Sequence, residues 1–144
     1  MYYLVLVILC LIAGIDLHSF RYDVKRLVLM LVIVLIVIFD GLRNETGTDW
    51  LNYYNTFINK VAIFEFGYNE YFLLIRKFTS NYHIFLMITT TLIISLSYIS
   101  IYKITNSFTS ILIYYTATIG ILGANRQLLA LGVSLVGIYF YLKN

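Results

Sequence analysis

The stretch from Ile84 to Tyr102, IFLMITTTLIISLSYISIY, contains no charged residue and no proline. As an α-helix it would be about 28 Å long, close to the thickness of the hydrocarbon core of a bilayer. Of the 144 residues in the chain, 61% are hydrophobic and only 12% are charged. Soluble domains are about 45–50% apolar and about 25% charged, and a domain of this size cannot bury such an excess. The sequence therefore predicts a membrane protein and excludes a soluble enzyme, a DNA-binding module and a disordered linker.

Similar apolar runs lie on both sides of this stretch, and together they predict an all-α membrane protein that forms one polytopic domain over residues 1–144. Basic residues are concentrated in the short segments after the first, third and fifth runs, which places those segments in the cytoplasm and the N-terminus outside. The longest segment between spans, about residues 43–83, then forms an outer loop. The five predicted transmembrane helices are 2–17, 23–42, 84–102, 108–124 and 128–142.

Counted from Asp40 to His83, the outer segment carries five of the seven acidic residues and many aromatic ones, and its periodicity predicts two short amphipathic helices. The first opens after Gly47, with Thr48 as its N-cap and Asp49 in its first turn. The second runs from about Gly67 to Phe78. Both are expected to lie at the outer membrane–water interface, where amphipathic aromatic side chains settle. Their rings then have two alternative roles, as membrane anchors or as platforms for sugars.

The polar residues beside the spans also have alternative interpretations. Arg43 is a candidate ligand-binding group, or it snorkels from the end of the second span to lipid headgroups. Arg126 lies in Asn125-Arg126-Gln127, a polar break between two apolar runs. Ionisable residues at membrane depth usually face a partner or a cavity, although Arg126 is alternatively a simple charge in an outer turn. Asp49 is alternatively only a favourable charge at a helix start.

Motifs of soluble enzymes are missing from the sequence: it has no Gly-rich phosphate loop, no HExxH and no GxSxG. The single cysteine, Cys10, and the two histidines, His18 and His83, do not have the spacing of metal ligands. The basic residues are scattered rather than gathered in a stripe. We therefore expect no metal site, no cofactor and no nucleic-acid partner.

Three polar elements follow one another along the chain. They are Gly41-Leu42-Arg43 with Gly47-Thr48-Asp49-Trp50 and Tyr53-Tyr54, then Phe64-Glu65-Phe66-Gly67-Tyr68, and finally Asn125-Arg126-Gln127 with Ala130. In this order and at these spacings they resemble the "GxR…GTDxxxY", "EPGY" and "RQ…A" elements of the EpsG-like family of bacterial polysaccharide polymerases, functional relatives of Wzy-type O-antigen polymerases. Phe66 stands where proline is usual.

This resemblance implies a glycosyltransferase in the bacterial cytoplasmic (inner) membrane that polymerises lipid-linked oligosaccharide repeat units at the outer face. A growing glycan on undecaprenyl pyrophosphate would be moved onto another lipid-linked unit. The site residues that the resemblance implies are Arg43 and Arg126 for the pyrophosphate, Asp49 and then Glu65 as the general base, and Trp50, Tyr53, Tyr54 and Tyr68 for the sugars. Gln127 is a further substrate-binding residue. The expected partners are the bilayer, the lipid-linked oligosaccharide, a flippase and chain-length regulator proteins.

Members of this family are usually much longer than this chain, which resembles their N-terminal portion. A truncated gene product, a fragment and one part of a split protein are the alternatives. A second hypothesis is therefore a non-catalytic small membrane subunit of a polysaccharide assembly or export complex, or an inactive truncated remnant.

Overall fold

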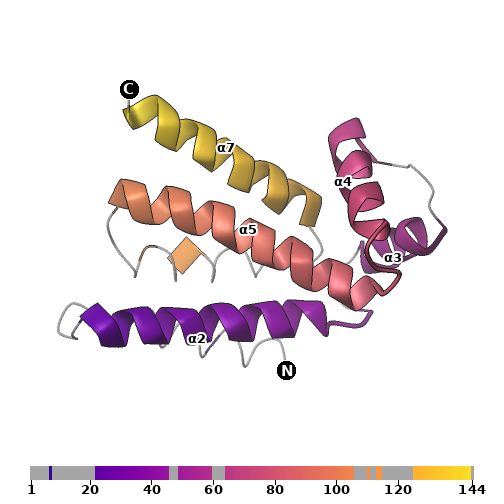
Figure 1. Cartoon of the computed structure of the whole chain (residues 1–144), viewed down its shortest axis with the longest axis horizontal. Coiled ribbons are helices and arrows are strands. Elements are labelled where there is room, and N and C mark those ends of the chain that lie inside the picture. Colours follow the sequence, from indigo (N-terminus) through magenta and orange to yellow (C-terminus); the bar gives the residue numbers. More distant parts are fainter. Residues whose placement is uncertain are drawn as a thin grey trace.

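A computed structural model describes residues 7, 22–45, 49–59, 64–105, 110, 113–114 and 125–143 of the chain, and these residues form helices and short connections without any strand (Figure 1). The all-α prediction is confirmed for this part of the chain. The helices are α2 (Tyr22–Gly41), α3 (Trp50–Asn59), α4 (Phe66–Arg76), α5 (Tyr82–Thr105) and α7 (Asn125–Lys143).

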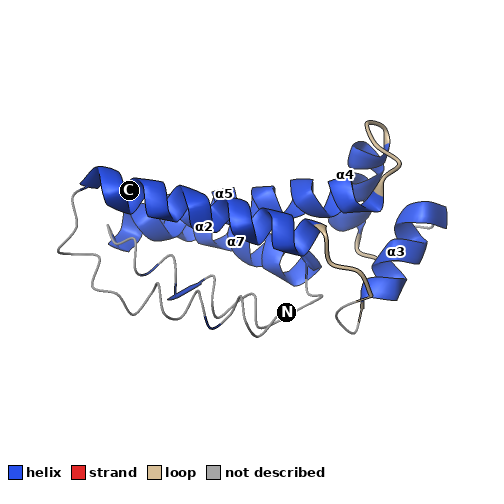
Figure 2. Ribbon diagram, turned by 90° about the horizontal axis from the view of Figure 1, so that it is seen from below, coloured by secondary structure: helices blue, strands red, loops and turns tan. Residues whose placement is uncertain are grey.

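The three long helices lie side by side, with α5 between α2 and α7 and in contact with both (Figure 1). Helix α2 runs in the opposite direction to α5 and α7, so that its last turn lies at the same end of the bundle as their first turns. Helices α3 and α4 lie beyond this end, as Figure 2 shows from another direction. The three polar elements of the sequence therefore meet at one end of the molecule.

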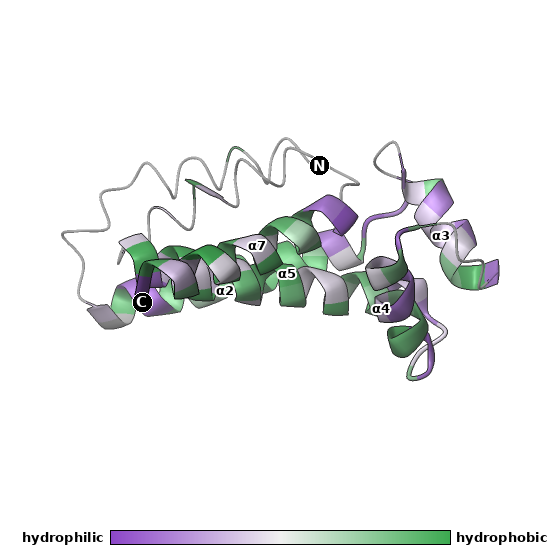
Figure 3. Cartoon of the chain, turned by 90° about the horizontal axis from the view of Figure 1, so that it is seen from above, coloured by the Kyte–Doolittle hydropathy of each residue, from purple (hydrophilic) through white to green (hydrophobic). Residues whose placement is uncertain are grey.

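Helix α2 shows why the long helices suit a bilayer. One stripe of it, Leu29, Val32 and Ile36, is buried in a cluster with Ile94 of α5. A second apolar stripe stays exposed. Figure 3 shows that the long helices are mainly apolar while the polar residues gather around α3, α4 and the helix ends. An exposed stripe of this length is unusual for a soluble monomer and normal for a lipid-facing helix. The side chains of this stripe are Leu27, Met30, Leu31, Val34, Leu35 and Ile38, each at least 45% exposed.

The observed helices refine the predicted boundaries. Helix α5 extends the predicted 84–102 at both ends, and within the described ranges it is the one helix long and apolar enough to cross a membrane. Helix α7 begins three residues earlier than predicted, so Arg126 lies in its first turn and not in a break before it. The predicted spans 2–17 and 108–124 fall outside the described residues, apart from Val7, Ser110, Ile113 and Tyr114.

Glycines bring the long helices close together. A Cβ atom on Gly41 would lie 2.2 Å from Cγ of Met87, and one on Gly132 would lie 3.2 Å from Cβ of Leu96. The last turn of α2 and the middle of α7 thus approach α5 at positions that a larger residue would obstruct. At the first of these junctions, Nδ1 of His83 lies 2.8 Å from the carbonyl oxygen of Gly41, the last residue of α2.

Replacing Gly41 with alanine is expected to destabilise the protein by about 1–3 kcal/mol, because Met87 must leave its position and overpacked cores lose about this much. The measurement is the thermal unfolding of the purified protein in detergent. Gly137→Ala is the control, since a Cβ there meets nothing within 4 Å. Equal melting temperatures for Gly41→Ala and Gly137→Ala would contradict the close packing of α2 on α5.

Candidate functional site

The two short helices are attached to the bundle by an aromatic cluster. We define the aromatic cluster as the buried side chains Trp50, Tyr53, Phe57, Tyr68, Phe72, Tyr82, Phe85 and Leu86. Its ring centroids are 4.8–5.8 Å apart where they meet, with tilted, edge-on and stacked pairs. The amphipathic periodicity of the outer loop therefore buries its aromatic face against the start of α5.

This packing bears on the sugar-stacking role implied for four rings. Trp50, Tyr53 and Tyr68 are at most 7% exposed, so protein atoms cover their faces in this conformation. Tyr54 is only half-buried and stacks on Trp50 at 4.9 Å. Of the four rings, Tyr54 is thus the one with surface left for a sugar, and its sugar contact stays a prediction.

Arg43 follows the C-terminal end of α2, and its side chain is only 4% exposed. It does not reach the surface to snorkel, as one interpretation of the sequence had it. One nitrogen, Nη1, lies 3.3 Å from Oδ1 of Asp40, while Nε and Nη2 are buried without a hydrogen-bond partner among the described residues. Nε and Nη2 occupy the same edge of the guanidinium plane, where their N–H groups point in parallel. One edge of the Arg43 guanidinium, with two parallel N–H donors, is therefore buried and has no hydrogen-bond partner among the described residues.

Asp40 holds this arginine with the help of a second helix. Its Oδ2 accepts a hydrogen bond from the hydroxyl of Thr90, a buried residue of α5. No sequence pattern predicted a role for either residue. The spacing of Asp40 and Arg43, three residues apart across a helix end, was an available signal, whereas Thr90 lies 50 residues further along the chain and gave none.

Arg126 and Glu65 form an ion pair, although 61 residues separate them. Nη1 of Arg126 donates to Oε2 of Glu65 at 2.9 Å, and the guanidinium carbon lies 5.1 Å from the centre of the Phe64 ring. Asn69 fixes Phe64 by accepting its backbone N–H at 3.2 Å and donating to its carbonyl oxygen. The structure thus joins two of the three sequence elements through the residues predicted for the site.

This pair lies at the surface, with side-chain exposures of 32% for Arg126 and 68% for Glu65. Exposed ion pairs contribute only about 0–1 kcal/mol to stability, because water screens both charges. An anion that binds Arg126 more tightly can therefore displace Glu65, because little free energy is lost when this ion pair breaks.

Each of the two arginines affects the pKa of a buried tyrosine. Burial raises the pKa of Tyr53, and the positive charge of Arg126 partly offsets this effect. Burial also raises the pKa of Tyr68, as do the neighbouring Tyr53, Tyr82 and Tyr71, while Arg43 lowers it. The rings of Tyr53 and Tyr68 are 5.8 Å apart. Both hydroxyls stay protonated at neutral pH and remain hydrogen-bond donors.

Several buried hydrogen-bond donors besides those of Arg43 have no partner among the described residues. The hydroxyls of Tyr68 and Tyr82 and Nε1 of Trp50 are buried without a hydrogen-bond partner in the part of the chain that the structure describes. Nδ2 of Asn125, which precedes Arg126, is also buried without a hydrogen-bond partner among the described residues. Buried polar groups in proteins nearly always have a partner. Buried donors without a partner, such as these, are suited to an anionic group.

Asp49 and Gln127 lie at the surface. Asp49 immediately precedes α3, and its carbonyl oxygen accepts the N–H of Tyr53 at 3.1 Å, as expected at a helix start. Its carboxylate forms no hydrogen bond or ion pair with the described residues, and its predicted neighbour Thr48 lies outside them. Gln127 is exposed in the first turn of α7. The structure thus leaves both side chains accessible but does not bring Asp49 into contact with either arginine.

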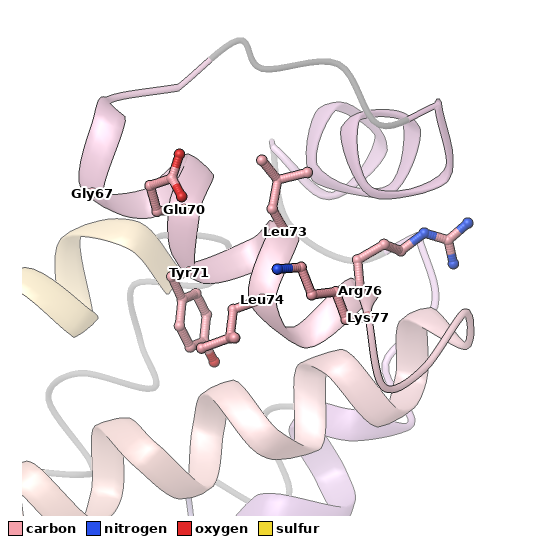
Figure 4. A pocket seen from close by; sticks show the side chains of 7 residues that line it. All are labelled: Gly67, Glu70, Tyr71, Leu73, Leu74, Arg76 and Lys77. Carbon is pink, nitrogen blue, oxygen red and sulfur yellow. The ribbon is translucent and has the colours of Figure 1, made fainter.

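Two hollows occur near the short helices. An open one of about 760 Å³ follows α4, where Figure 4 shows Glu70 and Lys77 beside Tyr71 and Leu74. None of the predicted site residues lines it. A second cavity of about 10 Å³, enclosed in the aromatic cluster, has room for about one water molecule. Within the described ranges, no three His, Cys, Asp or Glu side chains come together in a way that would hold a metal ion.

A comparison with known protein families matches residues 26–144 to the EpsG family. No curated protein and no solved structure matches the chain. The family match covers most of the chain and all three sequence elements, whose residues meet at one end of the bundle. The chain therefore belongs to the EpsG family, whose members are membrane proteins of polysaccharide biosynthesis.

Proposed function

We propose that this protein polymerises lipid-linked oligosaccharide repeat units at the outer face of the bacterial cytoplasmic membrane. The observation that carries the proposal is the buried, unpartnered Nε–Nη2 edge of Arg43. A guanidinium edge binds two phosphate oxygens at once through parallel, charge-assisted hydrogen bonds. Membership of a family of polysaccharide biosynthesis makes the pyrophosphate of a lipid-linked sugar the anion that fits.

In the proposed reaction, a sugar hydroxyl of the acceptor attacks the anomeric carbon of the donor glycan. A new glycosidic bond forms, the bond from that carbon to the pyrophosphate oxygen breaks, and undecaprenyl pyrophosphate leaves with the electron pair. Arg43 stabilises the negative charge that develops on the leaving group. Donors fixed in a water-poor site are effective in this role because they need no reorganisation during the reaction.

Arg126 supports the leaving group from the surface side. Its guanidinium is held by Glu65 at 2.9 Å, and phosphate oxygens offer the same planar arrangement of acceptors. The incoming pyrophosphate therefore replaces Glu65 and releases its carboxylate. The proton of the attacking hydroxyl goes to a carboxylate, for which Asp49 is the first candidate and Glu65 the second. Gln127 is a further donor toward the phosphates, and Tyr54 offers a ring to a sugar.

The experiment that tests this function removes the protein from the bacterium that carries it. We expect single repeat units to accumulate on the lipid carrier and long polymer to disappear, because polymerisation stops while unit assembly continues. The measurement is the length distribution of extracted lipid-linked glycans, with the wild-type protein restored as the control. Long polymer that persists on the lipid without reaching the cell surface would instead identify a non-catalytic subunit of an export complex.

A further inference from the structure

We propose that Asp40 and Thr90 are positioning residues that aim the free edge of Arg43 at the leaving pyrophosphate. This inference rests on the proposed function. Both oxygens of the Asp40 carboxylate are engaged, Oδ1 by Nη1 of Arg43 at 3.3 Å and Oδ2 by the hydroxyl of Thr90. The contact chain therefore runs from the central helix α5, through the last turn of α2, to the arginine.

This chain fixes the direction of the guanidinium. An arginine side chain is long and flexible, and Arg43 stands in a connection rather than in a helix. Because Asp40 holds the guanidinium at Nη1, the opposite edge formed by Nε and Nη2 keeps no hydrogen-bond partner among the described residues, and in this proposal it receives the ligand. Thr90 prevents the carboxylate from rotating away, since its hydroxyl comes from a different helix.

The same junction is rigid in its backbone. Gly41 lies against Met87, and the carbonyl oxygen of Gly41 is in contact with Nδ1 of His83 at 2.8 Å. Thr90 is one turn beyond Met87 on α5 and is only 6% exposed. The ends of α2 and α5 therefore hold Asp40 and Thr90 at a constant separation.

Positioning can be distinguished from a simple counter-charge. If Asp40 acted only as a negative charge beside the anion site, its removal would strengthen anion binding because a repulsion disappears. If Asp40 aims Arg43, its removal weakens binding although the local charge becomes more positive. Thr90→Val tests the same point with a smaller change. Valine has nearly the volume of threonine, so the substitution removes the hydrogen bond to Asp40 and leaves both charges in place.

The experiment measures the dissociation constant of inorganic pyrophosphate by calorimetry on the purified full chain, together with the melting temperature. We expect Thr90→Val to bind about 10-fold more weakly, as for the loss of one hydrogen bond to a charged group. Its melting temperature falls because Asp40 loses a partner, but the variant stays folded at the temperature of the binding measurement. Thr90→Ser, which restores the hydroxyl, is expected to restore binding. The matched control is Thr91→Val, because Thr91 is exposed and, among the described residues, its hydroxyl bonds only to the carbonyl oxygen of Met87.

The outcomes separate this inference from the proposed function. Wild-type affinity in Thr90→Val, combined with lost binding in Arg43→Ala, would overturn positioning and leave the anion site intact. Undiminished binding in Arg43→Ala would contradict the proposed function itself. Asp40→Ala provides a second test if Thr90→Val fails to accumulate: weaker binding supports positioning, and tighter binding reduces Asp40 to a counter-charge.

Discussion

Arg43→Lys is expected to lose long polymer almost as completely as Arg43→Ala, with a rate of glycosyl transfer about 10²–10³-fold below that of the wild type. Lysine keeps the positive charge and the attraction to Asp40, so the fold is preserved. The ammonium group cannot reproduce the parallel donors of Nε and Nη2, which the structure leaves buried and free. The measurement is the polymer length distribution in cells together with the amount of protein in the membrane.

Arg26→Lys is the matched control, because Arg26 is exposed in the first turn of α2, at the end of that helix opposite to Arg43. It should give wild-type polymer. Polymer of normal length from Arg43→Lys would show that the arginine serves only as the partner of Asp40, and the proposed pyrophosphate contact would have to be given up.

Asp49→Asn is expected to slow glycosyl transfer by about 10²–10⁴-fold, the usual cost of losing a general base. Asparagine keeps the size of the side chain but cannot take up a proton. The alternative role is a favourable charge at the start of α3, which contributes only about 0.3–1 kcal/mol and would leave polymer nearly intact. The exposed carboxylate of Asp49, free of ion pairs with the described residues, is compatible with either role until the rate is measured.

Glu65→Gln and Glu70→Gln complete this comparison, because all three changes convert an outer carboxylate to an amide. Glu70 lines the hollow along α4 and forms no hydrogen bond or ion pair with the described residues, so its variant should polymerise normally. If Asp49→Asn polymerises normally while Glu65→Gln does not, the base role passes to Glu65. Normal polymer from both would exclude a base among these two residues.

Local patterns were enough to predict most of the helices. The uncharged run from Ile84 to Tyr102 lies within α5, and the aromatic spacing from Trp50 onward produced α3. The start of α7 was placed too late, because the polar residues Asn125, Arg126 and Gln127 resemble a loop when only hydrophobicity is considered. In the structure they form the first turn of the helix, with Arg126 supported by Glu65 and Phe64.

The sequence by itself determined the membrane class, the helical periodicity and the three elements that identify the family, since each depends on residue type and short-range spacing. Only the tertiary structure decided that Arg43 is buried and bound to Asp40, that Thr90 completes this contact, and that Arg126 meets Glu65. It also decided that most aromatic rings of the outer loop form a core. The physical reason is that the contacts of Thr90 with Asp40 and of Arg126 with Glu65 join side chains 50 and 61 residues apart, and that the burial of Arg43 depends on the elements packed around it. Their meeting depends on how α2, α5 and α7 pack, and no local pattern encodes that arrangement.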